Sequence, residues 1–90
     1  MPDQTPNDPY SLALTALAAT LSDERRAQRF LLLTGIETED LRRRAADPTL
    51  LLALIAFLEA HEPDLLSVCD HIGVKPDALI AAGRQIEEAQ

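Results

Sequence analysis

The sequence predicts an all-α fold, a compact bundle of five to six short helices. Apolar residues make up 47% of the 90-residue chain but aromatic residues only 3%, so Leu and Ala must supply the core. Three Gly and six Pro are too few turn-forming residues for a sandwich of many short strands. The length suits a single domain, which we place at residues 8–90.

The first helix is predicted to begin at Asp8-Pro9. Residues 1–7 are polar and carry two prolines, so we expect them to form a flexible N-terminal tail. Asp8 is a favoured N-cap residue, and proline is favoured at the first helical position. The helix then continues to residue 21, with an apolar stripe at helical spacing formed by Leu14, Leu17 and Leu21.

The second and third helices follow from capping signals around one glycine. Asp23 caps a second helix that runs to about Thr34. Gly35 follows as its expected left-handed C-terminal cap, which requires a positive φ. The segment that starts at Thr38 has acidic residues in its first turn and predicts a capped short helix through Ala46.

The second half of the chain predicts three more helices. Asp47-Pro48 repeats the cap-plus-proline start and opens a helix to about His61 that is apolar nearly all round. Such a helix is normally central, so Leu54 and Phe57 should be buried. A fifth helix starts at Glu62-Pro63 and ends at Gly73, whose φ should also be positive. The sixth starts at Lys75-Pro76-Asp77 and runs to the C-terminus on a stripe of Leu79, Ala82 and Ile86.

The two halves of the chain, residues 8–46 and 47–90, resemble each other. The segment Thr34–Leu41 aligns with Ile72–Leu79, and Asp8-Pro9 aligns with Asp47-Pro48. A tandem pair of three-helix units would explain this similarity. Convergent capping chemistry would also produce several of the matches, so both origins stay open.

The charge is acidic overall but unevenly spread. Fifteen acids against eight Lys and Arg residues give a net charge of −7. Residues 22–46 hold six Arg against five acids, whereas residues 47–90 hold two bases against eight acids. The net charge argues against nucleic acid and anionic membrane surfaces as partners, because it repels both at long range.

The cysteine content and hydropathy favour the cytoplasm. Cys69 is the only cysteine, so the chain has no internal disulfide and suits a reducing compartment. The N-terminus lacks the basic and apolar regions of a signal peptide. The longest apolar run, Leu50–Leu58, is far shorter than the roughly 20 residues that cross a bilayer.

The arginine cluster beside a leucine pair is the candidate partner-binding surface. On a helical wheel, three arginines of the second helix share one face opposite Phe30. A solvated face paired with nearby acids is the ordinary interpretation, and a docking surface for an acidic partner is the functional one. The leucine pair is covered either by another helix of the chain, which the number of neighbouring helices favours, or by a partner. The candidate residues are Arg25, Arg26, Arg29, Leu32, Leu33, Arg42, Arg43 and Arg44.

A helix-turn-helix nucleic-acid-binding protein is the first alternative. The spacing of small and aliphatic residues around the turn glycine fits Cys69, Gly73, Val74 and Leu79, and less well Leu31, Gly35, Ile36 and Leu41. The helices that would read DNA begin with acids, Asp77 in one copy and Glu39 and Asp40 in the other. Acids at these positions oppose the phosphate contacts that supply most of a DNA-binding protein's affinity.

A small-ligand binder or enzyme is the second alternative, and the sequence gives it little support. Cys69 and His71 point about 200° apart on a helix and so cannot share a metal ion. His61 has only Asp64 within helical reach, and two ligands do not make a zinc site. We therefore expect no catalytic residue, no metal and no cofactor.

The sequence resembles a family of small bacterial helical proteins of about this length known only as a domain of unknown function. The shared features are the run Phe30–Ile36, the start Asp40-Leu41-Arg42, the junction Ala46-Asp47-Pro48, the turn Gly73-Val74 and the start Pro76-Asp77. The resemblance covers residues 9–88 and implies a helical fold, but it assigns no catalytic residue. By elimination, and from the leucine excess and the segregation of Arg from acids, we expect a non-catalytic adaptor or regulator that binds a protein partner, either a different protein or a second copy in a homodimer.

Overall fold

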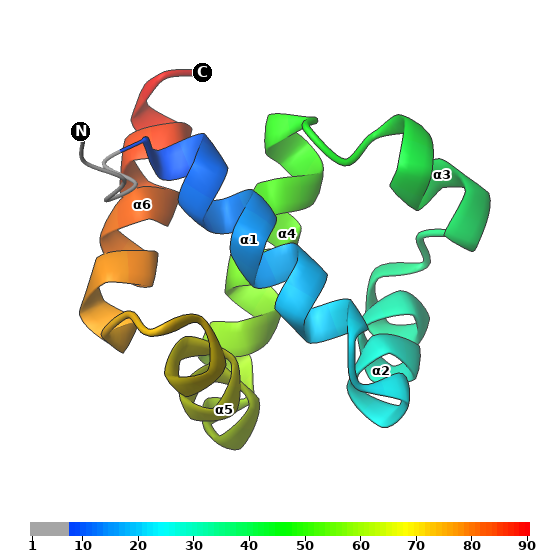
Figure 1. The fold of residues 1–90 in the computed structure, drawn as a ribbon. Coiled ribbons are helices and arrows are strands. Elements are labelled where there is room, and N and C mark those ends of the chain that lie inside the picture. The colour runs from blue at the N-terminus through cyan, green and yellow to red at the C-terminus, as the bar shows by residue number, and fades with distance from the viewer. Residues whose placement is uncertain (1–7) are drawn as a thin grey trace, which may run out of the picture.

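A computed structural model describes residues 8–90, so the prediction of a flexible tail at residues 1–7 lies outside the described residues. Residues 8–90 form six helices and no strand, which confirms the predicted all-α class (Figure 1). The helices are α1 (Pro9–Leu21), α2 (Glu24–Thr34), α3 (Thr38–Arg43), α4 (Pro48–Ala60), α5 (Glu62–Ile72) and α6 (Pro76–Glu88).

Three aspartates cap helices where the sequence predicts it. The side chain of Asp8 accepts a hydrogen bond from the Tyr10 amide, and that of Asp47 accepts one from the Thr49 amide. Asp23 accepts one from the Arg26 amide at 3.1 Å. Each bond satisfies an amide that the helix itself leaves without a partner.

The short third helix differs from its prediction at both ends. Its N-cap is Glu37, which makes no side-chain capping hydrogen bond, so the predicted capped start is wrong. It ends at Arg43 rather than Ala46, because Arg44 leaves helical geometry and Asp47 is already extended before Pro48. The helix is therefore little more than one turn and a half long.

Two glycines end helices in the left-handed conformation, as predicted. Gly35 has a φ of 74° and Gly73 a φ of 76°. The Gly35 amide donates to the Leu31 carbonyl, and the Val74 amide donates to the Cys69 carbonyl. Both bonds close the last turn of a helix.

Two crossing helices, α1 and α4, form the centre of the bundle. Figure 1 shows α1 running across α4, with α5 and α6 beside one part of the pair and α2 and α3 beside the other. Leu54 and Phe57 of α4 are buried as predicted. The prediction that α4 alone is central is incomplete, because α1 packs against α2, α4, α5 and α6. Ala13 and Ala16 of α1 are fully buried, and their small side chains let the neighbouring helices approach α1 closely.

The apolar stripes predicted on α1 and α6 have different outcomes. Leu79, Ala82 and Ile86 of α6 are all buried, as predicted. On α1, by contrast, Leu17 is buried as predicted and Leu21 is partly buried, but Leu14 is 40% exposed, because the buried face is centred on a different row of residues. That row consists of Leu12, Ala13, Ala16, Leu17, Ala19 and Thr20.

The first two helices of each half of the chain match in length, but the third helices do not. α1 and α4 each have 13 residues, and α2 and α5 each have 11. The third members differ, with 6 residues in α3 and 13 in α6. A tandem duplication of three-helix units stays a prediction.

Candidate functional site

Two leucines on α2 expose apolar surface that no other helix of residues 8–90 covers. Leu32 is 83% exposed and Leu33 is 61% exposed. The sequence favoured coverage by another helix, and this expectation is wrong. α2 packs through its opposite face, where the buried Phe30 meets Phe57 edge to face at a centroid distance of 5.5 Å. The short α3 packs least of all the helices against the rest of the bundle, so it does not shield this end of α2.

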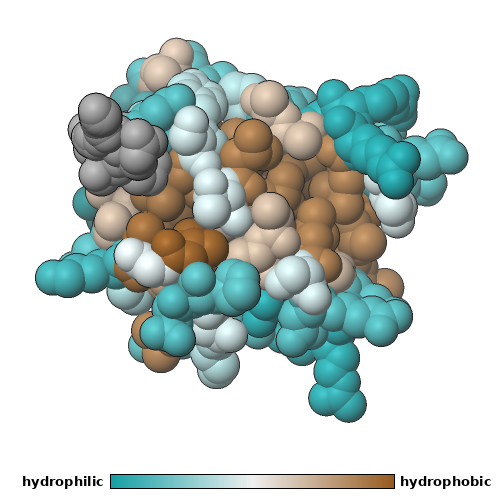
Figure 2. All heavy atoms as spheres, viewed as in Figure 1, coloured by the Kyte–Doolittle hydropathy of each residue, from teal (hydrophilic) through white to brown (hydrophobic). Residues whose placement is uncertain are grey.

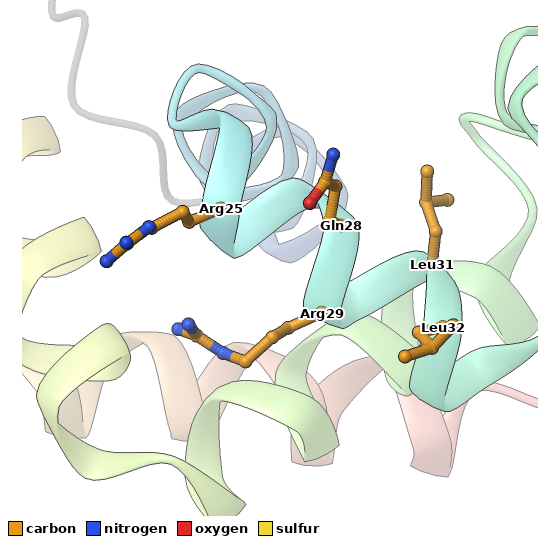
Figure 3. A pocket seen from close by; sticks show the side chains of 5 residues that line it. All are labelled: Arg25, Gln28, Arg29, Leu31 and Leu32. Carbon is orange, nitrogen blue, oxygen red and sulfur yellow. The ribbon is translucent and has the colours of Figure 1, made fainter.

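The outer face of α2 borders a shallow hollow of about 610 Å³, lined by Arg25, Gln28, Arg29, Leu31 and Leu32. Arg25, Gln28, Arg29 and Leu32 recur at the spacing of one helical face. Figure 3 shows the Arg25 and Arg29 side chains extending at one end of this face, with Leu31 and Leu32 at the other. Gln28 and Leu31 were not among the residues predicted for this surface, although Gln28 lies at helical spacing from both Arg25 and Leu32. We call Arg25, Gln28, Arg29, Leu32 and Leu33 the α2 surface.

The two arginines of the α2 surface have different electrostatic surroundings. Arg29 forms an ion pair with Asp64 of α5, and its side chain stays 47% exposed. Arg25 is exposed and has no ion pair within residues 8–90. The α2 surface therefore carries one partly neutralised cation and one available for an acidic group.

Arg26 is a correction to the predicted surface. Its side chain is turned inward and is only 9% exposed. The guanidinium donates to the backbone carbonyls of Ala19 at 3.0 Å and Thr20 at 3.4 Å, and to the Ser67 hydroxyl at 3.4 Å. Arg26 therefore joins the end of α1 to α5 and is not available to a partner.

The three consecutive arginines around α3 lie outside the α2 hollow. Arg43 pairs with Asp40, and Arg44 pairs with Asp47 at 3.2 Å. Arg42 is exposed, makes no ion pair within the described part of the chain, and lines a separate groove between α1 and α3. The structure thus divides the predicted arginine cluster between two places.

The candidate nucleophile and metal ligands do not assemble into a site. Cys69 is buried in the core, where desolvation raises the pKa of its thiol. His61 sits at the end of α4, with Nδ1 2.8 Å from the Phe57 carbonyl oxygen, while His71 is exposed on α5. Between residues 8 and 90 no three His, Cys, Asp or Glu side chains are grouped to hold a metal ion.

The turn between α5 and α6 has the buried residues of a helix-turn-helix but an acidic outer surface. Cys69 and Leu79 are both buried on either side of Gly73. The charged residues exposed on α6 are Asp77, Arg84, Glu87 and Glu88. A phosphate backbone would meet one arginine among three acids there.

Comparison with known proteins identifies a family but no activity. In the part of the chain that the structure describes, no helix is both long enough and apolar enough to cross a membrane. No curated protein and no solved structure matches the sequence. The family model described as "Protein of unknown function (DUF3572)" matches residues 6–89. Because this match spans nearly the whole sequence, the chain belongs to the DUF3572 family of proteins of unknown function.

Proposed function

We propose that this protein is a non-catalytic interaction domain that acts as an adaptor or regulator, and that its α2 surface binds an acidic amphipathic segment of a partner protein. The observation that carries the proposal is the 83% exposure of Leu32 beside a hollow lined by Arg25 and Arg29. An exposed leucine next to cations suits a segment that has both an apolar anchor and carboxylates.

The α2 surface is well suited to binding because contacts on the inner face of α2 fix the helix to the rest of the domain. Phe30 packs into the core and Arg26 bonds to α1 and α5, so the outer face needs little ordering when a partner docks. Burying a leucine contributes about 1.5–3 kcal/mol of favourable transfer free energy. Leu32 is therefore the expected anchor contact.

The charges define the chemistry of the partner. Asp or Glu side chains of the partner segment would lie over Arg25 and Arg29, and an apolar side chain would lie against Leu32 and Leu33. A second copy fits this surface poorly, because two α2 surfaces would bring the same arginines together. A different protein is therefore the proposed partner. The proposed compartment is the cytoplasm, where reducing conditions keep a free thiol such as that of Cys69 intact.

The test is quantitative capture of partners by the tagged protein and by variants that place a glutamate on the α2 surface. Leu32→Glu and Arg25→Glu should each weaken the capture of a stoichiometric partner at least tenfold, because each removes one half of the recognition chemistry. Leu66→Glu, on the 50% exposed Leu66 of α5, is the matched control and should leave capture unchanged. Peptide scanning of the partner should then locate the contact in a segment rich in Asp or Glu.

Three results would contradict the proposal. The first is capture that both α2 variants leave intact. The second is a contact segment in the partner without acidic residues. The third is a homodimer in sizing chromatography that Leu32→Glu dissociates. Circular dichroism should show that Leu32→Glu stays folded, since the side chain it replaces is in solvent.

A further inference from the structure

A second apolar depression lies between α1 and α3, apart from the α2 surface. This groove has a volume of about 270 Å³ and is lined by Leu14, Leu17, Ala18, Leu21, Leu41, Arg42 and Ala45. Figure 2 shows hydrophobic surface gathered on this face between α1 and α3, with hydrophilic side chains at its edge. We call it the α1–α3 groove.

The groove stays open because of the residues that border it. α3 has six residues, and its one buried side chain is Leu41, which is 8% exposed and forms part of the groove wall. Ala18 and Ala45 are too small to fill the space between the two elements. As a result Leu14, which points to this side of α1, remains 40% exposed.

One cation stands at the edge of this apolar space. The lining is almost wholly apolar, so Arg42 contributes the aliphatic part of its side chain and carries its guanidinium toward solvent. Its neighbours Arg43 and Arg44 are neutralised by Asp40 and Asp47, whereas Arg42 has no ion pair among the described residues. The groove thus combines an apolar slot with a single available positive charge.

We propose that the α1–α3 groove binds a single-chain carboxylate amphiphile such as a medium-chain fatty acid, with its alkyl chain in the slot and its carboxylate at Arg42. Leu14 and Leu21 are two helical turns apart, or about 10 Å. An extended alkyl chain of about eight carbons has a similar length, at roughly 1.3 Å per bond along its axis. The volume of about 270 Å³ is below the roughly 300–1,000 Å³ of pockets for larger ligands, so the groove suits a single alkyl chain better than a ring-bearing cofactor.

The alkyl chain and the carboxylate make separable contributions. Each methylene that enters the slot should strengthen binding about fourfold, and the gain should stop once the chain exceeds the slot. The ligand's carboxylate should add binding free energy through its ion pair with the Arg42 guanidinium, and this part should be lost when Arg42 is replaced. This site is independent of the α2 surface, so either proposal can fail without the other.

The experiment is a methyl NMR titration with octanoate, 1-octanol and octyltrimethylammonium. Octanoate should shift the methyl signals of Leu14, Leu17, Leu21 and Leu41 and leave those of Leu32 and Leu33 unmoved. Arg42→Gln should weaken octanoate binding about tenfold without changing octanol binding. Arg43→Gln, on the neighbouring arginine that is already paired, is the matched control and should change neither.

Two further measurements complete the test. Hexanoate, octanoate, decanoate and dodecanoate should gain affinity up to about eight to ten carbons and then reach a plateau. Ala18→Phe should abolish binding by filling the slot, and because Ala18 is exposed the variant should keep its helical circular dichroism. The proposal is overturned if octanoate moves none of the groove methyls, if Arg42→Gln and Arg43→Gln behave alike, or if octyltrimethylammonium binds as well as octanoate.

Discussion

At the scale of single residues, Arg26 illustrates how a charged side chain can serve the interior of a small domain. α1 has no basic residue in its last turn, so its terminal carbonyls need hydrogen-bond donors from elsewhere. The Arg26 guanidinium bonds to two of them, at Ala19 and Thr20, and reaches across to Ser67. One side chain thus connects α1, α2 and α5.

We expect Arg26→Ala to lower the free energy of unfolding by about 1–3 kcal/mol, because within residues 8–90 it leaves the Thr20 carbonyl without a donor. The Ala19 carbonyl also loses a donor but keeps its bonds from the Ser22 amide and hydroxyl. Arg25→Ala should change it by less than about 0.5 kcal/mol, since Arg25 is exposed and unpaired within residues 8–90. Urea unfolding of the two variants beside the parent chain makes the comparison. Equal effects of the two substitutions would show that the hydrogen bonds of Arg26 contribute nothing to the free energy of unfolding.

The prediction that Arg26 shares an outer face with Arg25 and Arg29, opposite Phe30, is wrong, and its burial was partly visible in the sequence. On a helical wheel Arg26 lies about 40° from Phe30 and about 60° from Arg29, at the border between the inner and outer faces. Spacing alone assigns it to neither side. Arg26 turns inward because it can reach the carbonyls at the end of α1. No local sequence pattern specifies where those carbonyls lie relative to α2.

At the scale of helices, the closest approach of α4 and α6 depends on a glycine within a helix. A Cβ atom built at Gly83 would lie 3.2 Å from Cγ2 and 3.3 Å from Cδ1 of Ile55. Glycine costs about 1 kcal/mol in a helix interior relative to alanine. Here its lack of a side chain lets the two helices pack closely.

We expect Gly83→Ile to lower the free energy of unfolding by about 1–3 kcal/mol, because the new side chain would push α6 away from Ile55. Ala81→Ile is the matched control on the same helix, and its exposed position should tolerate the change. Thermal unfolding followed by circular dichroism distinguishes the two. A Gly83→Ile variant as stable as the Ala81→Ile variant would contradict the packing argument.

The helix starts could be predicted from the sequence, and the inward faces only in part. Asp8 and Asp47 act on amides two residues away, so their capping role is local and visible in the sequence. The buried face of α1 was predicted only at Leu17 and Leu21, because Leu and Ala occupy nearly every side of that helix, and a uniform pattern does not specify which side packs. The early end of α3 at Arg43 follows from the extended Asp47-Pro48 junction.

At the scale of the whole molecule, part of the candidate site could be predicted and part could not. Arg25, Arg29, Leu32 and Leu33 were identified from their clustering on the second helix. Their exposure depends on where α3 and α5 lie, and this is a tertiary property. The division of the arginine cluster between the α2 surface and the α1–α3 groove has the same origin. It could not be predicted, because it depends on where α2 and α3 lie and on the Arg29–Asp64 pair between α2 and α5. The Arg43–Asp40 and Arg44–Asp47 pairs are local, three residues apart, and within reach of the sequence.

Acidification should act on the whole molecule through two capping carboxylates. Hydrogen bonds from the backbone amide of Arg26 lower the pKa of Asp23, and those from the Thr49 amide lower the pKa of Asp47. A carboxyl whose pKa is lower in the folded state stabilises the fold above its unfolded pKa of about 3.9. That contribution is lost as the pH falls through the folded-state pKa.

We therefore expect the melting temperature to fall as the pH drops below about 4, because the caps become protonated below their lowered pKa and the fifteen acids no longer balance the eight Lys and Arg residues. The double variant Asp23→Asn/Asp47→Asn keeps acceptor oxygens at both caps but cannot titrate there. It should melt within a few degrees of the parent at pH 7 and lose less stability between pH 4 and pH 2. Melting curves of both proteins across this range test the sign. If the two curves stay parallel, the acid sensitivity comes from net charge alone and the two caps have no part in it.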